Sequence, residues 1–426
     1  MTPNASTFVA NARTYSPSAR PVVVVCLDGS ADEYLDAAMA RGKMPNLQKM
    51  AVRGYRGFAR GALPSFTNVN NASIITGVPP SIHGISGNFF LDPQTGEEVM
   101  MNSAKYLRAE TITAAAARAG RKVGIVTAKE KLRDILGHGL FDSLNTLGAQ
   151  DSTRGIAFSS EKAPEAREKT HGISDVERVV GRRTPEIYSG DASLFVFYAG
   201  VALIESQRAD FLYLSTTDYI QHKHKPEDPA ALEFYAEIDT QLGRMLELGA
   251  ILGITADHGM NAKCKPDGSP NVIYLETLLR ETFQLEFKVI LPITDPYVLH
   301  HGALGSFAVV HGPSTAPFEK IAKWLLDLPG ITEVHDRATA AAKLELPADR
   351  IGDLIVLSGR DTVIGRTPAH HDLKAVASGL RSHGGRYEEM VPFIISEPLN
   401  DAYAVRAASD PRNFDIFDFA CNGTVR

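Results

Sequence analysis

Hydrophobic positions along this chain form short continuous runs that alternate with amphipathic segments. The runs lie at 21–27, 122–127, 211–215 and 251–256. Each is rich in aliphatic residues and lacks a polar alternate position, a pattern typical of strands buried on both faces of a parallel sheet. We therefore predict four strands of one central sheet.

The segments between these runs have helical periodicity. Within 230–248, apolar residues recur at helical spacing: Leu232, Tyr235, Ile238, Leu242 and Met245. Two more helices are predicted, one from about Met44 with Pro45 in its first turn and one at 111–119 ended by Gly120. Repeated strand–helix units predict an α/β fold with a doubly wound, mostly parallel sheet.

A different pattern covers 263–373. Strand-like pieces at 287–291, 306–310 and 354–357 and a helix at 318–328 are punctuated by proline and glycine. This predicts an inserted α+β cap domain, with 1–262 and 374–426 forming the core domain. Both ends of the insertion leave one sheet edge, so the cap should cover that edge. The polar segment 153–184 is predicted to be a surface excursion.

Composition places the chain among ordinary globular proteins. It has 426 residues, 44% of them hydrophobic and 22% charged, and a formal net charge of -6. That charge lacks the basic excess of nucleic-acid-binding proteins, so nucleic acid is not an expected partner.

No membrane partner is expected, because no apolar run approaches the length of about 20 residues that spans a bilayer. The first twenty residues lack the apolar stretch of a secretory signal. Cys26, Cys264 and Cys421 are too widely separated for a disulfide framework or a cysteine zinc site. We expect a cytoplasmic protein.

Acidic and histidine residues follow several of the predicted strands. Carboxyl ends of parallel strands meet at one sheet edge, where α/β proteins bind ligands. The candidates are Asp28, Asp218, His222, Asp257, His258 and His383. An isolated Asp-His pair is more often a cap or an ion pair, but this set has enough oxygen and nitrogen donors for two divalent metals.

Thr67 is the candidate nucleophile. It precedes a segment, closed by Gly77, that has the form of a helix. A hydroxyl at a helix N-terminus lies in a field that favours its anion, and a nearby metal would lower its pKa further. The alternative is that Thr67 only caps the helix, and Ser65 is the competing nucleophile.

The ordered motifs resemble the alkaline phosphatase superfamily, in its nucleotide pyrophosphatase/phosphodiesterase branch. The resemblance rests on Asp28 after a valine-rich strand, 64–68 leading to Thr76-Gly77, His83-Gly84-Ile85, Asp218 with His222, 255–260 and His383-Gly384. It implies an alkaline phosphatase-like fold and a phosphothreonine intermediate.

The resemblance also implies a ligand assignment. Asp28, Asp257, His258 and Thr67 would hold one metal. Asp218, His222 and His383 would hold the other. Zinc is the expected metal, with iron or manganese as alternatives.

Substrate class depends on residues outside this shared set. Lys129 and Lys131 follow the strand at 122–127, and the resemblance extends to members that hydrolyse phosphonoacetate. It implies cleavage of a carbon–phosphorus bond, with both lysines on the substrate carboxylate and Asn88 on a phosphoryl oxygen. The expected partner is a small anionic phosphonate, and a homodimer is an open alternative for the oligomeric state.

Two rival functions follow from the same residues. A phosphodiesterase or nucleotide pyrophosphatase would need an aromatic nucleotide slot, for which Phe66, Phe89, Phe90 and Tyr219 are candidates. A metal-binding sensor without catalysis is the second rival, and retention of Thr67 beside a full ligand set disfavours it.

Overall fold

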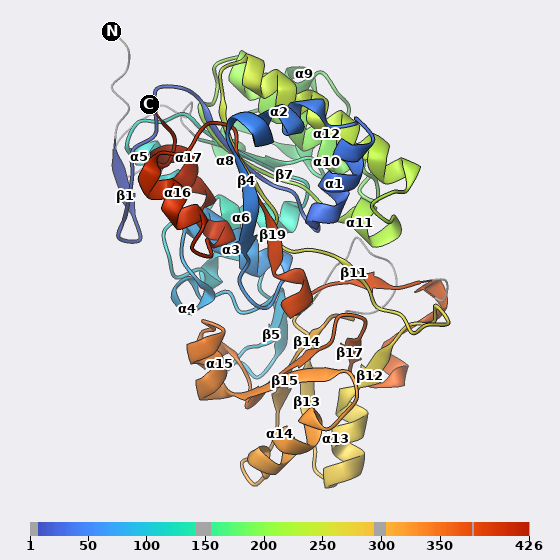
Figure 1. The fold of residues 1–426 in the computed structure, drawn as a ribbon. Helices are drawn as coiled ribbons and strands as arrows, with labels where there is room; N and C mark the ends of the chain where they lie inside the picture. The colour runs from blue at the N-terminus through green and yellow to red at the C-terminus, as the bar shows by residue number, and fades with distance from the viewer. Residues whose placement is uncertain (1–6, 142–154, 294–303, 377–378, 426) are drawn as a thin grey trace.

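The structure is a computed structural model that describes residues 7–141, 155–293, 304–376 and 379–425. It consists of a larger lobe that contains both ends of the described chain and a smaller lobe below it (Figure 1). No helix among the described residues is both long and apolar enough to cross a membrane.

A seven-stranded sheet forms the centre of the larger lobe, in the order β4-β19-β10-β3-β9-β7-β8. The strands are β3 (Val22–Cys26), β4 (Tyr55–Arg60), β7 (Val123–Thr127), β8 (Gly155–Ser159), β9 (Phe211–Ser215), β10 (Ile251–Thr255) and β19 (Met390–Ile395). β10, β3, β9, β7 and β8 pair in parallel, whereas β19 is antiparallel to both of its neighbours. The predicted α/β fold with a mostly parallel sheet is therefore confirmed.

Alternate residues of β3 enter two different hydrophobic cores. Val23 and Val25 pack with helices α1 (Asp32–Ala40), α2 (Pro45–Arg53), α10 (Asp191–Glu205) and α12 (Pro229–Glu247). Val22 and Val24 pack with α5 (Ile112–Arg118), α6 (Glu130–Leu136) and α17 (Ile416–Asn422) on the other face. Because both faces are covered by helices, these strands need no polar side, which explains their continuous apolar sequences.

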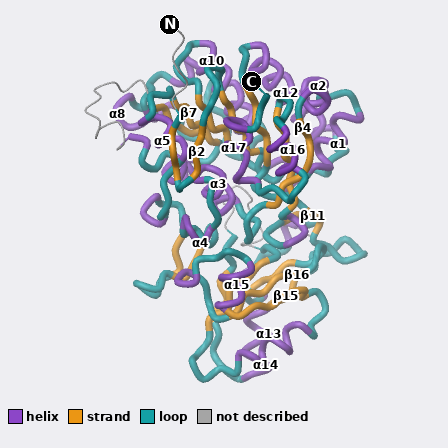
Figure 2. The backbone as a smooth tube through the Cα atoms, turned by 60° about the vertical axis from the view of Figure 1, so that its left-hand side comes forward, coloured by secondary structure: helices purple, strands orange, loops and turns teal. Residues whose placement is uncertain are grey.

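The smaller lobe has its own sheet, in the order β13-β14-β16-β15. Its antiparallel strands are β13 (Lys288–Ile290), β14 (Phe307–His311), β15 (Ile331–Asp336) and β16 (Leu354–Ser358). Helices α13 (Leu275–Phe283), α14 (Phe318–Leu326) and α15 (Arg337–Lys343) accompany this sheet (Figure 2). β12 (Val272–Tyr274) pairs with β17 (Val363–Gly365). The domain boundaries at 263 and 373 remain a prediction.

Residues from before the insertion complete the hydrophobic core of the smaller lobe. Phe66, Ile85 and Phe90 belong to the same buried cluster as Phe307 and Ile355. β5 (Phe89–Leu91), which pairs with β6 (Glu98–Met100), also contacts β13. The cap therefore packs directly on the segment that contains Thr67.

The predicted surface excursion at 153–184 was wrong for the stretch that forms β8, whereas most of 161–184 is half-buried or exposed. β8 is fully buried and parallel to β7 at the edge of the sheet. The flanking charged residues obscured this short strand. Sequence patterns also missed α10, because that helix is apolar on nearly all sides and shows no amphipathic stripe.

Candidate metal centre

Four neighbouring strands deliver the candidate residues to one edge of the central sheet. Asp28 follows β3, Lys129 follows β7, Asp218 follows β9, and Asp257 with His258 follows β10. Every one of these side chains is buried. Because the four strands run parallel and in register, their carboxyl ends bring these groups together.

One cluster contains Asp28, Asp218 and His258, whose ligand atoms all lie within 4.8 Å of one another. His258 Nε2 is 3.2 Å from Asp28 Oδ1 and 3.9 Å from Asp257 Oδ2. Asp257 adjoins this cluster, but its Oδ1 accepts hydrogen bonds from the backbone N–H groups of Gly29 and His258.

A second cluster contains Asp218, His222 and His383. α11 (Tyr219–Lys223) begins directly after Asp218, which places Asp218 and His222 on one side of its first turn. His222 Nε2 is 2.9 Å and His383 Nε2 is 3.8 Å from Asp218 Oδ2. Asp218 thus belongs to both clusters, which the sequence did not indicate.

Each of the three histidines is oriented by a backbone carbonyl. Nδ1 of His222, His258 and His383 lies 3.0, 2.8 and 2.7 Å from the carbonyl oxygens of Arg381, Gly259 and Ser65, respectively. A carbonyl only accepts, so Nδ1 must carry the hydrogen. Nε2 is then directed at the clusters, the usual arrangement of a metal-ligating imidazole.

Buried charge perturbs these groups strongly. Burial and the neighbouring Asp28 raise the pKa of Asp257 to about 7. Burial alone would lower the pKa of His258, but Asp257 and Asp28 outweigh it and raise that pKa to about 9. Burial would raise the pKa of Asp218, yet Lys129 and His222 hold it well below its usual range. The site therefore concentrates negative charge that only cations can balance.

A test of metal fit comes from atoms that the fold leaves without hydrogen bonds. Asp28 Oδ1, Asp218 Oδ2 and His258 Nε2 are buried, and their described neighbours are other members of the clusters at ion-pair distance and not hydrogen-bond partners of good geometry. Buried polar atoms normally have such partners, so an atom without one indicates a missing ligand. Mixed oxygen and nitrogen donors suit zinc and similar divalent ions, and the residues present fit such a group.

The two lysines have different surroundings. Lys129 Nζ lies 2.8 Å from Asp28 Oδ2 and 3.3 Å from Asp218 Oδ1, inside the acidic cluster. Lys131 is exposed, and its Nζ lies 3.8 Å from Met100 Sδ. The structure brings Lys129, but not Lys131, into contact with the candidate metal ligands.

Thr67 is the first residue of α3 (Thr67–Thr76), a helix buried along its whole length. Phe66 holds the N-cap position and Gly77 ends the helix in the left-handed conformation. The alternative that Thr67 is the cap is thus wrong, because capping belongs to the preceding residue. Thr67 itself is 5% exposed.

Neighbouring polar residues restrain this end of α3. Asn88 Oδ1 accepts a hydrogen bond from the backbone N–H of Asn68, which ties Asn88 to the residue after Thr67. Ser65, the competing nucleophile, is fully buried, and its hydroxyl donates to the carbonyl of Gly385. The Ser65 hydroxyl is thus already engaged by the backbone, which favours Thr67 as the candidate nucleophile.

Two of the four residues of the candidate aromatic slot lie in the hydrophobic core. Phe66 is fully buried and packs edge-on against the ring of His383. Phe90 is buried against Tyr106. Two of the four aromatic residues are thus core residues, which weakens the nucleotide alternative.

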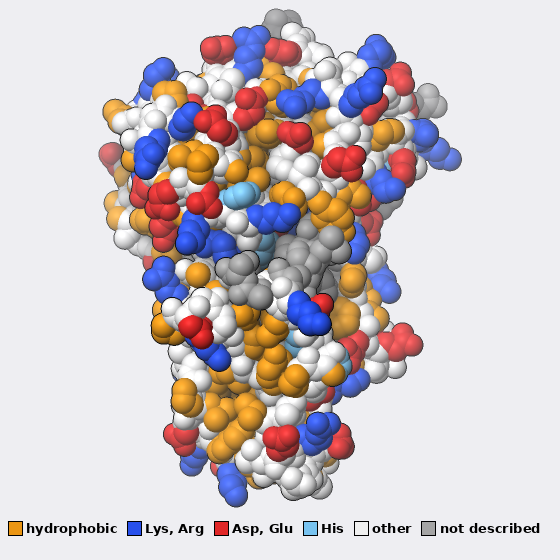
Figure 3. Space-filling view, turned by 90° about the vertical axis from the view of Figure 1, so that its right-hand side faces the viewer, with side chains coloured by type: hydrophobic (Ala, Val, Ile, Leu, Met, Phe, Trp, Pro, Cys, Tyr) orange, Lys and Arg blue, Asp and Glu red, His pale blue; other side chains and the backbone are white. Residues whose placement is uncertain are grey.

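The site lies at the junction between the lobes. His383 follows β18 (Arg381–Ser382), which pairs with β11 (Asn261–Ala262), the strand after His258. In the space-filling view the molecule narrows between the lobes, and basic and histidine side chains are visible there (Figure 3).

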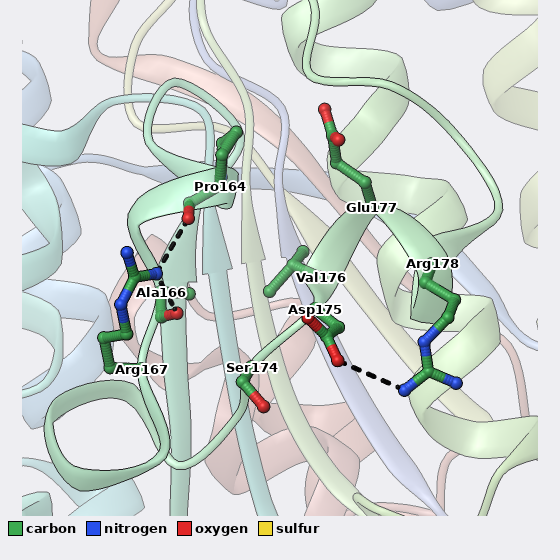
Figure 4. Close-up of a pocket in the computed structure, with 8 residues that line it drawn as sticks. All are labelled: Pro164, Ala166, Arg167, Ser174, Asp175, Val176, Glu177 and Arg178. Atoms are coloured by element: carbon green, nitrogen blue, oxygen red, sulfur yellow. Dashed lines mark hydrogen bonds and ion pairs between the residues drawn. The ribbon is translucent and has the colours of Figure 1, made fainter.

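A pocket elsewhere on the larger lobe contains none of the predicted site residues. It is lined by Pro164, Ala166, Arg167, Ser174, Asp175, Val176, Glu177 and Arg178 (Figure 4). Arg167 donates to the carbonyls of Pro164 and Ala166, and Asp175 pairs with Arg178. These charges are satisfied locally, so we assign the pocket no function.

Comparison with known proteins agrees with this site. Residues 22–385 match the family model described as type I phosphodiesterase / nucleotide pyrophosphatase. The chain belongs to this family of α/β enzymes. Within 98% of its length it is similar to phosphonoacetate hydrolase from Sinorhizobium meliloti 1021. It is 46% identical to the complex of that enzyme with phosphonoformate, covering 99% of that chain with a TM-score of 0.92. It is 45% identical to the complex of the same enzyme with phosphonoacetate, again covering 99% of that chain, with a TM-score of 0.91.

More distant relatives share less of the sequence. Murine ectonucleotide pyrophosphatase / phosphodiesterase 5 is 16% identical with a TM-score of 0.60, covering 94% of each chain, and shares the fold. A stretch of 78 residues is 41% identical to an uncharacterised pyrophosphatase/phosphodiesterase of Schizosaccharomyces pombe. That stretch is 18% of this chain and spans only 15% of the length of the yeast protein.

Proposed function

We propose that this protein hydrolyses the carbon–phosphorus bond of phosphonoacetate, producing acetate and phosphate. The observation that carries the proposal is the 46% identity to a phosphonoacetate hydrolase over 98% of the chain. The buried cluster of carboxylates, imidazoles and Lys129 supplies groups suited to this chemistry.

In this proposal two divalent metals bind at the clusters. Asp28, Asp257, His258 and Thr67 would hold one, and Asp218, His222 and His383 would hold the other. When bound, the metals supply positive charge for the phosphoryl oxygens and lower the pKa of the Thr67 hydroxyl. Zinc is our first choice, since structurally similar donor sets of nitrogen and oxygen favour it.

Thr67 Oγ attacks phosphorus and forms a new P–O bond while the C–P bond breaks. The electron pair of the broken bond passes to the methylene carbon and is delocalised onto the carboxylate, as an enolate-like dianion. The methylene carbon takes up one proton, which balances the proton that the Thr67 hydroxyl gives up as it attacks, and acetate is formed. Water then attacks phosphorus of the phosphothreonine, which releases phosphate and restores the hydroxyl.

Lys129 and Lys131 would bind the carboxylate and stabilise its growing charge, and Asn88 would contact a phosphoryl oxygen. A metal bound by Asp28 and Asp218 would repel the Lys129 ammonium from its position between them. The proposed role therefore requires Lys129 to rotate toward the substrate.

Phosphate release tests this function. The purified protein is incubated with phosphonoacetate, 2-aminoethylphosphonate, phosphonoacetaldehyde and nucleotide esters, and its metal content is measured on the same preparation. We expect phosphonoacetate to be the preferred substrate. Preferential turnover of a nucleotide ester would instead support a phosphodiesterase.

The nucleophile is tested in the same assay. Thr67→Ala should lose activity by several orders of magnitude, because no other hydroxyl replaces the attacking oxygen. Thr67→Ser should retain part of it. Ser65→Ala is the control, and an inactive Ser65→Ala beside an active Thr67→Ala would exchange the two roles.

Two further features belong to this proposal. All three cysteines are free, and Cys26 and Cys421 are buried. A cytoplasmic location is part of the proposal. A homodimer remains an open prediction.

A further inference from the structure

Asn71 is a fully buried residue of α3, one helical turn after Thr67. Its side-chain nitrogen donates to the carbonyl oxygen of Thr67 at 3.0 Å and to Asp257 Oδ2 at 3.2 Å. Its oxygen accepts hydrogen bonds from the hydroxyls of Tyr213 at 2.7 Å and Ser215 at 2.9 Å. All four hydrogen-bonding positions of the amide are therefore used.

These partners allow one orientation of the amide. The Thr67 carbonyl and an ionised Asp257 can only accept, so they must face the nitrogen. The hydroxyls of Tyr213 and Ser215 can donate, so they face the oxygen. A flipped amide would place its oxygen against two acceptors, which makes the observed orientation strongly preferred.

From this geometry we infer that Asn71 is a positioning residue that fixes the candidate nucleophile relative to a candidate metal ligand. The inference rests on the proposed function. One amide group links the backbone of Thr67 to the carboxylate of Asp257, while Tyr213 and Ser215 anchor that amide to β9. Asp257 Oδ1 is held by the backbone N–H groups of Gly29 and His258, so Asn71 completes the orientation of the carboxylate.

The expected consequence is specific to one metal. Groups that orient a metal ligand typically contribute about 10- to 100-fold to metal affinity or activity. Loss of Asn71 should weaken the metal held by Asp257 by this factor. The metal held by His222 and His383 should change much less, because Asn71 contacts neither of these histidines in the described hydrogen bonds.

Asn70 provides a matched control. It is the same residue type in the same helix and is also fully buried. Its side chain bonds to the backbone of Ala62 and to Asn413 and makes longer contacts with the carbonyl oxygens of Phe66 at 3.4 Å and Pro64 at 3.5 Å, but none of its described bonds reaches a candidate metal ligand. Asn70→Leu and Asn71→Leu therefore both remove buried hydrogen bonds, but only the second acts on the metal site.

Cobalt titration of the full-length protein, followed by its visible absorption, tests the inference. Asn71→Leu should weaken one of two sites about 10- to 100-fold, whereas Asn70→Leu should leave both sites within about threefold. With metal saturating, Asn71→Leu should lower kcat for phosphonoacetate more than it changes KM. Asn71→Ser, which is too short to reach Asp257, provides a milder variant in case the leucine protein does not fold.

The outcomes separate this inference from the proposed function. Natural protein that binds no cobalt contradicts the metal centre itself. Natural protein with two sites, together with unchanged sites in Asn71→Ser and Asn71→Leu, overturns only the role of Asn71. Equal weakening by Asn70→Leu and Asn71→Leu would also overturn it, since both effects would then reflect loss of helix packing.

Discussion

Lys129 brings a positive charge to the sheet edge where Asp28 and Asp218 gather. Its Nζ contacts both carboxylates, and it therefore competes with any cation that they bind. The same ammonium is proposed to stabilise the leaving group. Substitution of Lys129 should therefore affect metal affinity and phosphonoacetate hydrolysis differently.

Replacing Lys129 by Met should leave metal affinity undiminished while phosphonoacetate hydrolysis falls by about 100-fold or more, because one well-placed charge contributes several kcal/mol to such a step. An activated aryl phosphate, whose leaving group has no carboxylate, should lose far less. Steady-state kinetics on both substrates and a metal titration measure these effects.

Lys131 is the second lysine proposed to bind the substrate carboxylate. The loss of activity of Lys131→Met on phosphonoacetate, compared with its loss on the aryl phosphate, tests this role. Lys122 is the control, since it lies at the opposite end of β7 and donates to the carbonyl of Gln207. Lys122→Met should change neither substrate. Equal losses on both substrates in Lys129→Met would show that this residue supports the phosphoryl site in general.

His83 has a structural role that depends on pH. It is fully buried, its Nδ1 accepts a hydrogen bond from the N–H of Ile85, and its Nε2 lies 2.8 Å from the hydroxyl of Ser73. Burial lowers the pKa of His83 to about 3. In the unfolded chain the pKa is about 6.5, so the unfolded state binds more protons between these values.

The contribution of His83 to stability is therefore complete above about pH 6.5 and is lost as pH falls toward 3. At pH 5 the loss should be about 2 kcal/mol. Urea unfolding of metal-free protein at pH 7 and pH 5 measures it. His83→Gln, which cannot titrate, should lose about 2 kcal/mol less over this interval, and an identical loss in both proteins would contradict the assignment.

Elements that cross between the lobes are joined by a buried ion pair. Lys263 follows β11, and Glu388 lies in the short 3-10 helix η7 (Arg386–Glu388) before β19. Both side chains are fully buried, with Lys263 Nζ 2.8 Å from Glu388 Oε1 and 2.7 Å from the carbonyl oxygen of Arg360. Glu388 also accepts hydrogen bonds from Gly385 and, at its backbone carbonyl, from Gly259. The pair therefore supports the loops that carry His258 and His383.

Lys263→Met should destabilise the protein by about 3–5 kcal/mol, because the Glu388 carboxylate is left buried without its cation. Adding Glu388→Gln should recover a large part of that loss. The exposed pair Lys43–Glu233, at 2.6 Å, is the control, and Lys43→Met should cost no more than about 1 kcal/mol. Urea unfolding measures the free energy of unfolding of the three variants. A loss of no more than about 1 kcal/mol in Lys263→Met would contradict a stabilising role for the buried ion pair.

Elements differ in how well their sequences predicted them. The strands β3, β9 and β10 were predicted because burial on both faces requires an unbroken apolar run. The role of α3 was only partly predicted, because this helix is buried on all sides and no polar stripe distinguishes its asparagines. Asn71 was missed for that reason. Its importance depends on Tyr213 and Asp257, which only the tertiary structure brings to it.

At the scale of the whole molecule, the candidate metal ligands were predictable as a set, and the resemblance implied the grouping of Asp218, His222 and His383, but not the place of Asp218 in the other cluster as well. Residue type and position after strands identified Asp28, Asp218 and His258. That Asp218 belongs to both clusters depends on distances of a few ångströms between side chains. The position of the Lys129 ammonium between two carboxylates was not predictable either. It depends on the charges that the fold brings around it, which the order of residues along the chain does not reveal.

The order of the ligands along the chain has a consequence for biosynthesis. The first cluster draws on Asp28 and His258, whereas the second is incomplete without His383, which follows the whole smaller lobe in the sequence. The ligands proposed for the first ion are therefore all synthesised before the cap segment, whereas those proposed for the second are complete only after it. Under the proposed function, binding of the second ion would thus require that the cap has been synthesised and that the segments on either side of it have come together.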